Sequence, residues 1–105
     1  MLEKHFQADL IQELKELFPG CYVQKNDPYY QGIPDILILY KDKWAMLECK
    51  KSEREHRQPN QEYYVDMFNE MSFSRFIYPE NKEQVLYELQ RAFEPRRKAR
   101  IFKRE

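Results

Sequence analysis

Two apolar runs near the middle of the chain most constrain its fold. The first covers residues 36–40 and the second residues 44–47, with only Lys41, Asp42 and Lys43 between them. Short apolar runs on either side of a polar turn predict two antiparallel strands joined as a hairpin. Because nearly every position in both runs is apolar, we expect these strands at the centre of a sheet, covered on both faces.

Charged residues at the ends of this hairpin need a specific reason. Asp35 precedes the first run, directly after Gly32-Ile33-Pro34, and Glu48-Cys49-Lys50 follows the second. An unpaired buried carboxylate is costly, so a cation shared by Asp35 and Glu48 best explains the two acids. Side chains alternate along a strand, which places Glu48 and Lys50 on one face and Cys49 on the other.

These residue types suit phosphodiester hydrolysis. Magnesium is usually held by one or two carboxylates together with water and substrate phosphate. Asp35, Glu48 and the backbone carbonyl of Cys49 would be the protein ligands, and an oxygen-rich site would also accept manganese. Lys50 would orient the attacking water and offset the charge of the transition state. Taken singly, Pro-Asp is a common turn pair and Glu-x-Lys an ordinary exposed-strand pair.

The rest of the chain predicts three helices and two further strands. Apolar residues at helical spacing, together with proline and glycine breaks, place the helices. The expected order is a helix over 3–18, a strand over 21–24, the hairpin over 34–50, a helix over 59–71, a strand over 73–78 and a helix over 82–93. In the second helix we expect the buried stripe to be Tyr63, Tyr64, Met67 and Phe68.

These motifs, in this order, resemble the PD-(D/E)xK nuclease superfamily and, within it, the small phage and bacterial VRR-NUC domains. The resemblance covers about residues 3–90 and rests on Glu3-x3-Gln7, Gly32-Ile33-Pro34-Asp35, Glu48-Cys49-Lys50, Gln61 and the strand over 73–78. It implies an α/β fold with a restriction-endonuclease-like αβββαβα core, in which helices flank a central mixed sheet. By position, it makes Glu3 the first-helix acid that completes the metal site, and Gln61 the polar residue that follows the lysine.

Alternatives stay open at both of these positions. Glu13 on the same helix competes with Glu3, which is also a plain acid favoured by the dipole at a helix start. Gln61 is equally explained as a residue that starts a helix after Pro59-Asn60.

The resemblance also implies a function and its partners. It implies Mg²⁺-dependent hydrolysis of DNA by a homodimer, with branched DNA such as four-way junctions as substrate, as in Holliday junction resolvases. Flap, single-stranded or duplex DNA is the alternative substrate. A non-catalytic protein that binds nucleic acid or a host factor is the alternative of another class, and the intact set of Asp35, Glu48 and Lys50 argues against it.

Basic charge is concentrated in residues 94–105. This segment holds six Lys and Arg and two Glu, whereas residues 1–93 hold twelve basic and sixteen acidic side chains, so that the whole chain is neutral. We therefore divide the chain into a nuclease domain over 1–93 and a basic C-terminal tail over 94–105. The tail is expected to contact phosphates, and the alternative is a solvated tail that aids solubility.

Location is predicted from what the chain lacks. It has no apolar run of membrane-spanning length and no basic-then-apolar leader, so we expect a cytoplasmic protein, in the host cytoplasm if phage-encoded. Cys21 and Cys49 lack metal-ligand spacing and are expected to be reduced. His5 and His56 have no partner at ligand spacing and are not expected to be catalytic.

Overall fold

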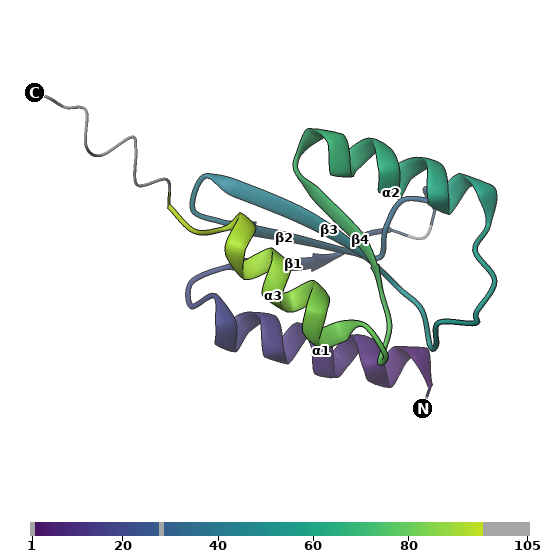
Figure 1. Cartoon of the computed structure of the whole chain (residues 1–105), viewed down its shortest axis with the longest axis horizontal. Coiled ribbons are helices and arrows are strands. Elements are labelled where there is room, and N and C mark those ends of the chain that lie inside the picture. Colours follow the sequence, from purple (N-terminus) through teal and green to yellow (C-terminus); the bar gives the residue numbers. More distant parts are fainter. Residues whose placement is uncertain (1, 28, 96–105) are drawn as a thin grey trace, which may run out of the picture.

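A four-stranded mixed sheet with helices on both faces forms the centre of the protein (Figure 1). The computed structural model describes residues 2–27 and 29–95. Along the chain the elements are α1 (Glu3–Leu17), β1 (Tyr22–Lys25), β2 (Ile36–Tyr40), β3 (Lys43–Cys49), α2 (Pro59–Met71), β4 (Phe73–Ile77) and α3 (Lys82–Ala92). The predicted αβββαβα order and fold class are confirmed, and the boundaries differ from expectation by one or two residues at most. Residues 96–105 of the predicted basic tail lie outside the described residues.

The sheet has the strand order β1-β2-β3-β4. β1 pairs antiparallel with β2 and β2 with β3, whereas β3 and β4 run parallel. The hairpin between β2 and β3 turns at Lys41, whose φ of 57° lies in the left-handed region used by tight hairpin turns. The two apolar runs are therefore the central strands, as their composition predicts.

The core lies between the sheet and the pair α1 and α3 (Figure 1). Its fully buried members come from the sheet and from both helices: Leu10, Leu14, Ile36, Ile38, Ala45, Leu47, Cys49, Ile77 and Leu89. The buried face of α3 contributes Val85, Leu86 and Leu89 to this core, and Phe93 at the C-terminal end of the helix joins them. Among the described residues, no helix is long and apolar enough to cross a membrane.

The expectation that both faces of β2 and β3 are covered is wrong for β2. α2 packs on β3 and β4 and leaves the β1–β2 half of that face without a helix. Leu39 of β2 is 42% exposed, and its cross-strand partner Tyr22 is 56% exposed. The apolar composition of a strand therefore predicts that the strand is central in the sheet more reliably than it predicts that helices cover both of its faces.

The predicted buried stripe of α2 is also wrong. Val65 is its buried residue, and Tyr63 is 62% exposed. Tyr64 and Phe68 are half-buried and stack on each other, and Trp44 meets Phe68 edge-on with the ring centroids 6.1 Å apart. α2 lies toward the β4 edge of the sheet, so its aromatic residues form a partly covered cluster rather than a core stripe.

Candidate active site

The loop before β2 positions Asp35. The Asn26 N–H donates to the Asp35 carbonyl over 2.8 Å, and the Asn26 side-chain amide donates to the Pro34 carbonyl over 2.8 Å. Gly32 has a φ of +90°, and a Cβ there would lie 2.9 Å from the Asn60 side chain at the start of α2. Only glycine fits this conformation and this close contact, so the loop is fixed against both β2 and α2.

Asp35 is bonded to the neighbouring strand. Its Oδ2 accepts the backbone N–H of Cys49 over 2.9 Å, which joins the ends of β2 and β3 that carry the acids. Burial raises the pKa of Asp35, while the Cys49 N–H and the Lys50 charge lower it. Asp35 is half-buried rather than enclosed in the core.

Gln61 joins Glu48 and Lys50 on one face of β3. Both charged side chains are only 4% exposed. The Gln61 Nε2 donates to Glu48 Oε2 over 3.1 Å, and Lys50 Nζ donates to Gln61 Oε1 over 2.8 Å. Cys49 lies on the opposite face, in the hydrophobic core, as the alternation predicts.

The segment between β3 and α2 completes the surroundings of Lys50. Lys50 Nζ donates to the His56 carbonyl over 3.0 Å and lies 3.8 Å from Glu55 Oε2. The other Glu55 oxygen accepts the Lys51 N–H over 2.7 Å. The ammonium is therefore held by groups from this segment and from α2.

Acidic charge at the site exceeds basic charge. Burial, followed by repulsion from Asp35, raises the pKa of Glu48 to about 8, although Lys50 lowers it. Burial, followed by repulsion from Glu55 and Asp35, also raises the pKa of Glu3. The carboxylates oppose one another's ionisation, which is the electrostatic condition that a bound cation would relieve.

The structure separates the two candidates on α1. Glu3 interacts electrostatically with Asp35 and Glu48, whereas Glu13 forms an ion pair with Lys82 of α3. Sequence spacing alone does not distinguish them, since both stand on the same helix. Glu3 is therefore the α1 acid within electrostatic range of Asp35 and Glu48, but among the described residues it does not join them as a third metal ligand.

Gln61 fits both of its proposed roles. Besides contacting Glu48 and Lys50, its Oε1 accepts the Gln58 N–H over 2.9 Å, which caps the start of α2. Glu55 was missed, because its alternation with basic residues in 50–57 is typical of a mixed surface loop. The one local indication of its role is its position four residues after Lys51, because a side chain at that spacing can turn back and accept the Lys51 N–H.

The donor set fits a divalent cation that keeps part of its water. Among residues 2–27 and 29–95, no three His, Cys, Asp or Glu side chains are placed to ligate one ion. Asp35 and Glu48, however, could supply two hard oxygen ligands: both carboxyls have raised pKa values, Asp35 contributes to the rise at Glu48, and Asp35 accepts the backbone N–H of the residue after Glu48. Magnesium commonly binds to one or two carboxylates and completes its shell with water and phosphate.

A solved structure shares this architecture. No family model matches the sequence, and no curated protein matches it. A solved structure described as a VRR-NUC domain superposes with a TM-score of 0.64 and 22% sequence identity, covering 84% of this chain and 94% of that one. At this identity the likeness shows the fold alone: the chain has the fold of a VRR-NUC domain.

Proposed function

We propose that this protein is a metal-dependent endonuclease that hydrolyses phosphodiester bonds in DNA. The observation that carries the proposal is the buried chain Glu48–Gln61–Lys50 beside Asp35. Moving a charged side chain from water into the protein costs roughly several kcal/mol per ion, before hydrogen bonds and ion pairs offset it. A protein that only binds DNA would have no need to bury these charges. The likeness to a VRR-NUC domain supports the same reaction class.

Asp35 and Glu48 would hold the metal ion, with Glu3 nearby and the Cys49 carbonyl as the backbone ligand. A bound Mg²⁺ would neutralise charge on the phosphate and lower the pKa of a water molecule. The Cys49 N–H fixes one oxygen of Asp35, and the Gln61 amide fixes one oxygen of Glu48. Each carboxylate is thus oriented before the substrate arrives.

Lys50 would act directly on the substrate. An ammonium group has three donors, and the Gln61 side chain and the His56 carbonyl each accept one. The third donor would bond to the attacking water or to an oxygen of the scissile phosphate. Because the ammonium is buried and fixed, its charge would act on the transition state without first being reoriented.

For the substrate, we propose branched DNA such as four-way junctions, cut by a homodimer. A chain of this size supplies one such site, and cutting both strands at a junction calls for two. Flap, single-stranded and duplex DNA are the competing substrates.

The decisive experiment is cleavage of matched four-way-junction, flap, single-stranded and duplex DNA, with magnesium, manganese or EDTA. Glu48→Gln keeps an acceptor for Gln61 but removes the charge, and Glu70→Gln on the exposed side of α2 is the matched control. We expect metal-dependent cleavage that Glu48→Gln reduces at least about 100-fold and Glu70→Gln leaves unchanged. If the parent protein and both variants bind these substrates but cleave none of them, the result would instead support the non-catalytic alternative.

The dimer is tested separately from the chemistry. Light scattering during size-exclusion chromatography gives the mass of the protein with and without junction DNA. A monomer in both conditions, together with cleavage of single-stranded DNA, would replace the junction assignment but keep the nuclease.

A further inference from the structure

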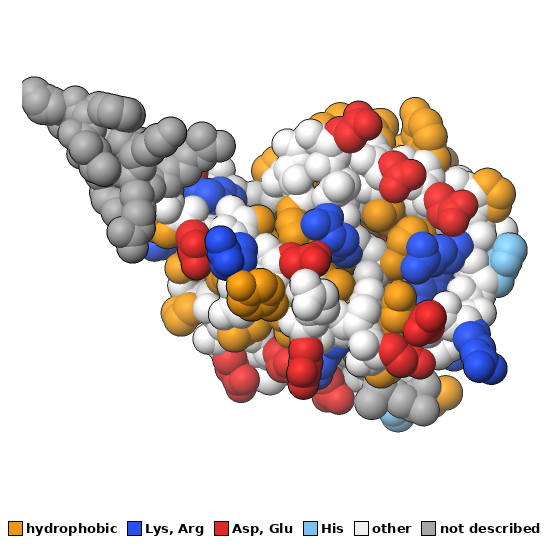
Figure 2. All heavy atoms as spheres, viewed as in Figure 1, with side chains coloured by type: hydrophobic (Ala, Val, Ile, Leu, Met, Phe, Trp, Pro, Cys, Tyr) orange, Lys and Arg blue, Asp and Glu red, His pale blue; other side chains and the backbone are white. Residues whose placement is uncertain are grey.

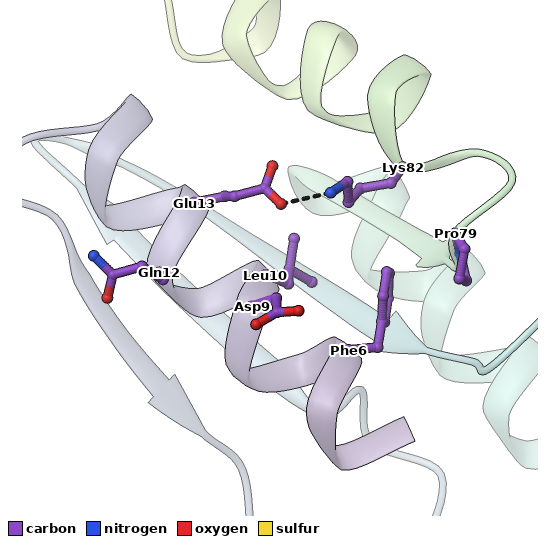
Figure 3. Close-up of a pocket in the computed structure, with 7 residues that line it drawn as sticks. All are labelled: Phe6, Asp9, Leu10, Gln12, Glu13, Pro79 and Lys82. Carbon is purple, nitrogen blue, oxygen red and sulfur yellow. Dashed lines mark hydrogen bonds and ion pairs between the residues drawn. The ribbon is translucent and has the colours of Figure 1, made fainter. Parts of the chain in front are cut away.

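A groove runs between α1 and α3, away from the candidate active site. It consists of two hollows of about 390 Å³ and about 300 Å³ that share Glu13. Phe6 and Leu86 form part of the floor, and both are almost fully buried. In Figure 3, Glu13 from α1 and Lys82 from α3 reach toward each other, with Phe6 and Pro79 on one side of this ion pair.

The rim of the groove is acidic. Asp9, Glu13 and Glu16 line it from α1 and Glu83 lines it from α3, whereas Lys82 is its one basic lining residue in the described chain. Figure 2 shows acidic side chains gathered along the lower edge of the molecule, over α1. The groove therefore favours a basic occupant.

The groove also offers exposed apolar surface. Leu17 is 37% exposed and Tyr87 is 54% exposed, and both line the hollow between α1 and α3. Apolar side chains between acidic groups match a segment in which apolar residues are flanked by basic ones.

We propose that residues 96–105 of the same chain dock in this groove. The segment has six basic residues and one acid, and Ile101-Phe102 stands between Arg100 and Lys103. Its net charge of +5 complements the groove, where four acids face one lysine. Ile101 and Phe102 supply apolar groups for Leu17 and Tyr87, and Arg100 and Lys103 supply charges for the acids beside them.

The chain is long enough for this docking. α3 has 11 residues, so it spans about 16 Å at a rise of about 1.5 Å per residue. The segment follows Pro95 at the C-terminal end of α3, and an extended chain covers about 3.3 Å per residue. The seven residues from 96 to 102 therefore cover up to about 23 Å, which is enough to bring Phe102 back along α3 to either hollow. The proposal does not depend on the nuclease function.

Nuclear magnetic resonance of the full-length, isotopically labelled protein tests the docking. In the variant Ile101→Ser/Phe102→Ser, we expect amide shifts to change in residues 9–17 of α1 and 83–90 of α3, with α2 unchanged. Neutralising the groove through Glu16→Gln/Glu83→Gln should in turn shift the amides of residues 98–104. The matched control, Asp66→Asn/Glu70→Gln on α2, should shift neither set.

Two results would overturn the proposal. If the Ile101/Phe102 substitutions change only amides of their own segment, the groove does not hold it. If the groove shifts appear but weaken on dilution of the protein, the occupant is the segment of a second copy. Groove shifts that are independent of protein concentration, and that high salt removes, are the result we expect.

Discussion

Glu48→Gln should stabilise the metal-free protein at neutral and alkaline pH. The carboxyl of Glu48 is 4% exposed, and burial together with repulsion from Asp35 raises its pKa from 4.5 to about 8. Below about pH 4.5 the group is protonated in both the folded and the unfolded protein, so it does not affect stability. Between pH 4.5 and about 8 the folded protein retains a proton that the unfolded chain has lost, and stability falls as pH rises.

The size of this effect follows from the pKa shift. One pKa unit corresponds to about 1.4 kcal/mol, so the shift amounts to about 3 kcal/mol at pH 7 and at most about 5 kcal/mol above pH 8. Glutamine carries no charge in either state, and its side-chain oxygen still accepts the Gln61 amide. The variant should therefore keep its stability over the range in which the parent protein loses it.

Urea denaturation in EDTA, followed through the fluorescence of the single tryptophan, Trp44, measures both stabilities. The two proteins should be equally stable near pH 4.5 and diverge steadily up to about pH 8. Glu70→Gln, an exposed change on α2, should follow the parent at every pH. Parallel pH profiles for the parent and Glu48→Gln would refute the argument that the folded structure opposes ionisation of Glu48.

Adding magnesium to the same samples separates metal binding from titration. A ligand present at 100 times its dissociation constant stabilises a folded protein by about 2.7 kcal/mol. We expect a gain of this kind in the parent at about pH 8, where Glu48 is free to ionise, and little gain in Glu48→Gln. Equal gains in both proteins would place the ion elsewhere.

Three further substitutions test the surroundings of the site. Gln61→Ala should leave Lys50 and Glu48 without their shared partner, lowering cleavage about 10- to 100-fold while Gln84→Ala on α3 does not. Gly32→Ala should destabilise the fold by about 1–3 kcal/mol in urea denaturation, because of its positive φ and its contact with the Asn60 side chain. Asn60→Ala removes Cγ and Nδ2 from this contact but keeps the Asn60 Cβ at 3.0 Å, so it should recover only part of the loss, and full recovery would contradict backbone strain. Ser74→Ala should be neutral or stabilise by up to about 1 kcal/mol, because the buried hydroxyl has no hydrogen-bond partner among the described residues; a clear loss of stability would contradict this.

The sequence was sufficient for the fold because its local signals agree with one another. Two apolar runs around a polar turn defined the hairpin, and Pro59 marked the first residue of α2. Composition could not predict that one face of β2 lacks a covering helix, because this depends on where α2 packs on the sheet. The same holds for Tyr63, because an aromatic residue at helical spacing is apolar whether or not another element covers it.

At the site, the sequence identified residues within one local motif better than residues brought together from elsewhere. Asp35, Glu48 and Lys50 were recognisable because charges at the ends of apolar strands are costly without a purpose. Choosing between Glu3 and Glu13 required the packing of α1, which pairs Glu13 with Lys82 and leaves Glu3 as the acid within electrostatic range of Glu48. Glu55 lay in a segment whose charge pattern resembles an ordinary surface loop.

The bonds around Lys50 also connect the candidate site to the docking of α2. Gln61 belongs to the first turn of that helix, and its Oε1 accepts from both Lys50 and the Gln58 backbone. Removing the ammonium would therefore loosen the start of α2 as well as remove a positive charge. Lys50→Met should increase hydrogen exchange at the amides of residues 58 and 60–62 while those of α3 remain protected, because α3 packs on the other face of the sheet. Unchanged exchange at residues 58 and 60–62 would show that α2 is held by its packing on β3 and β4 alone.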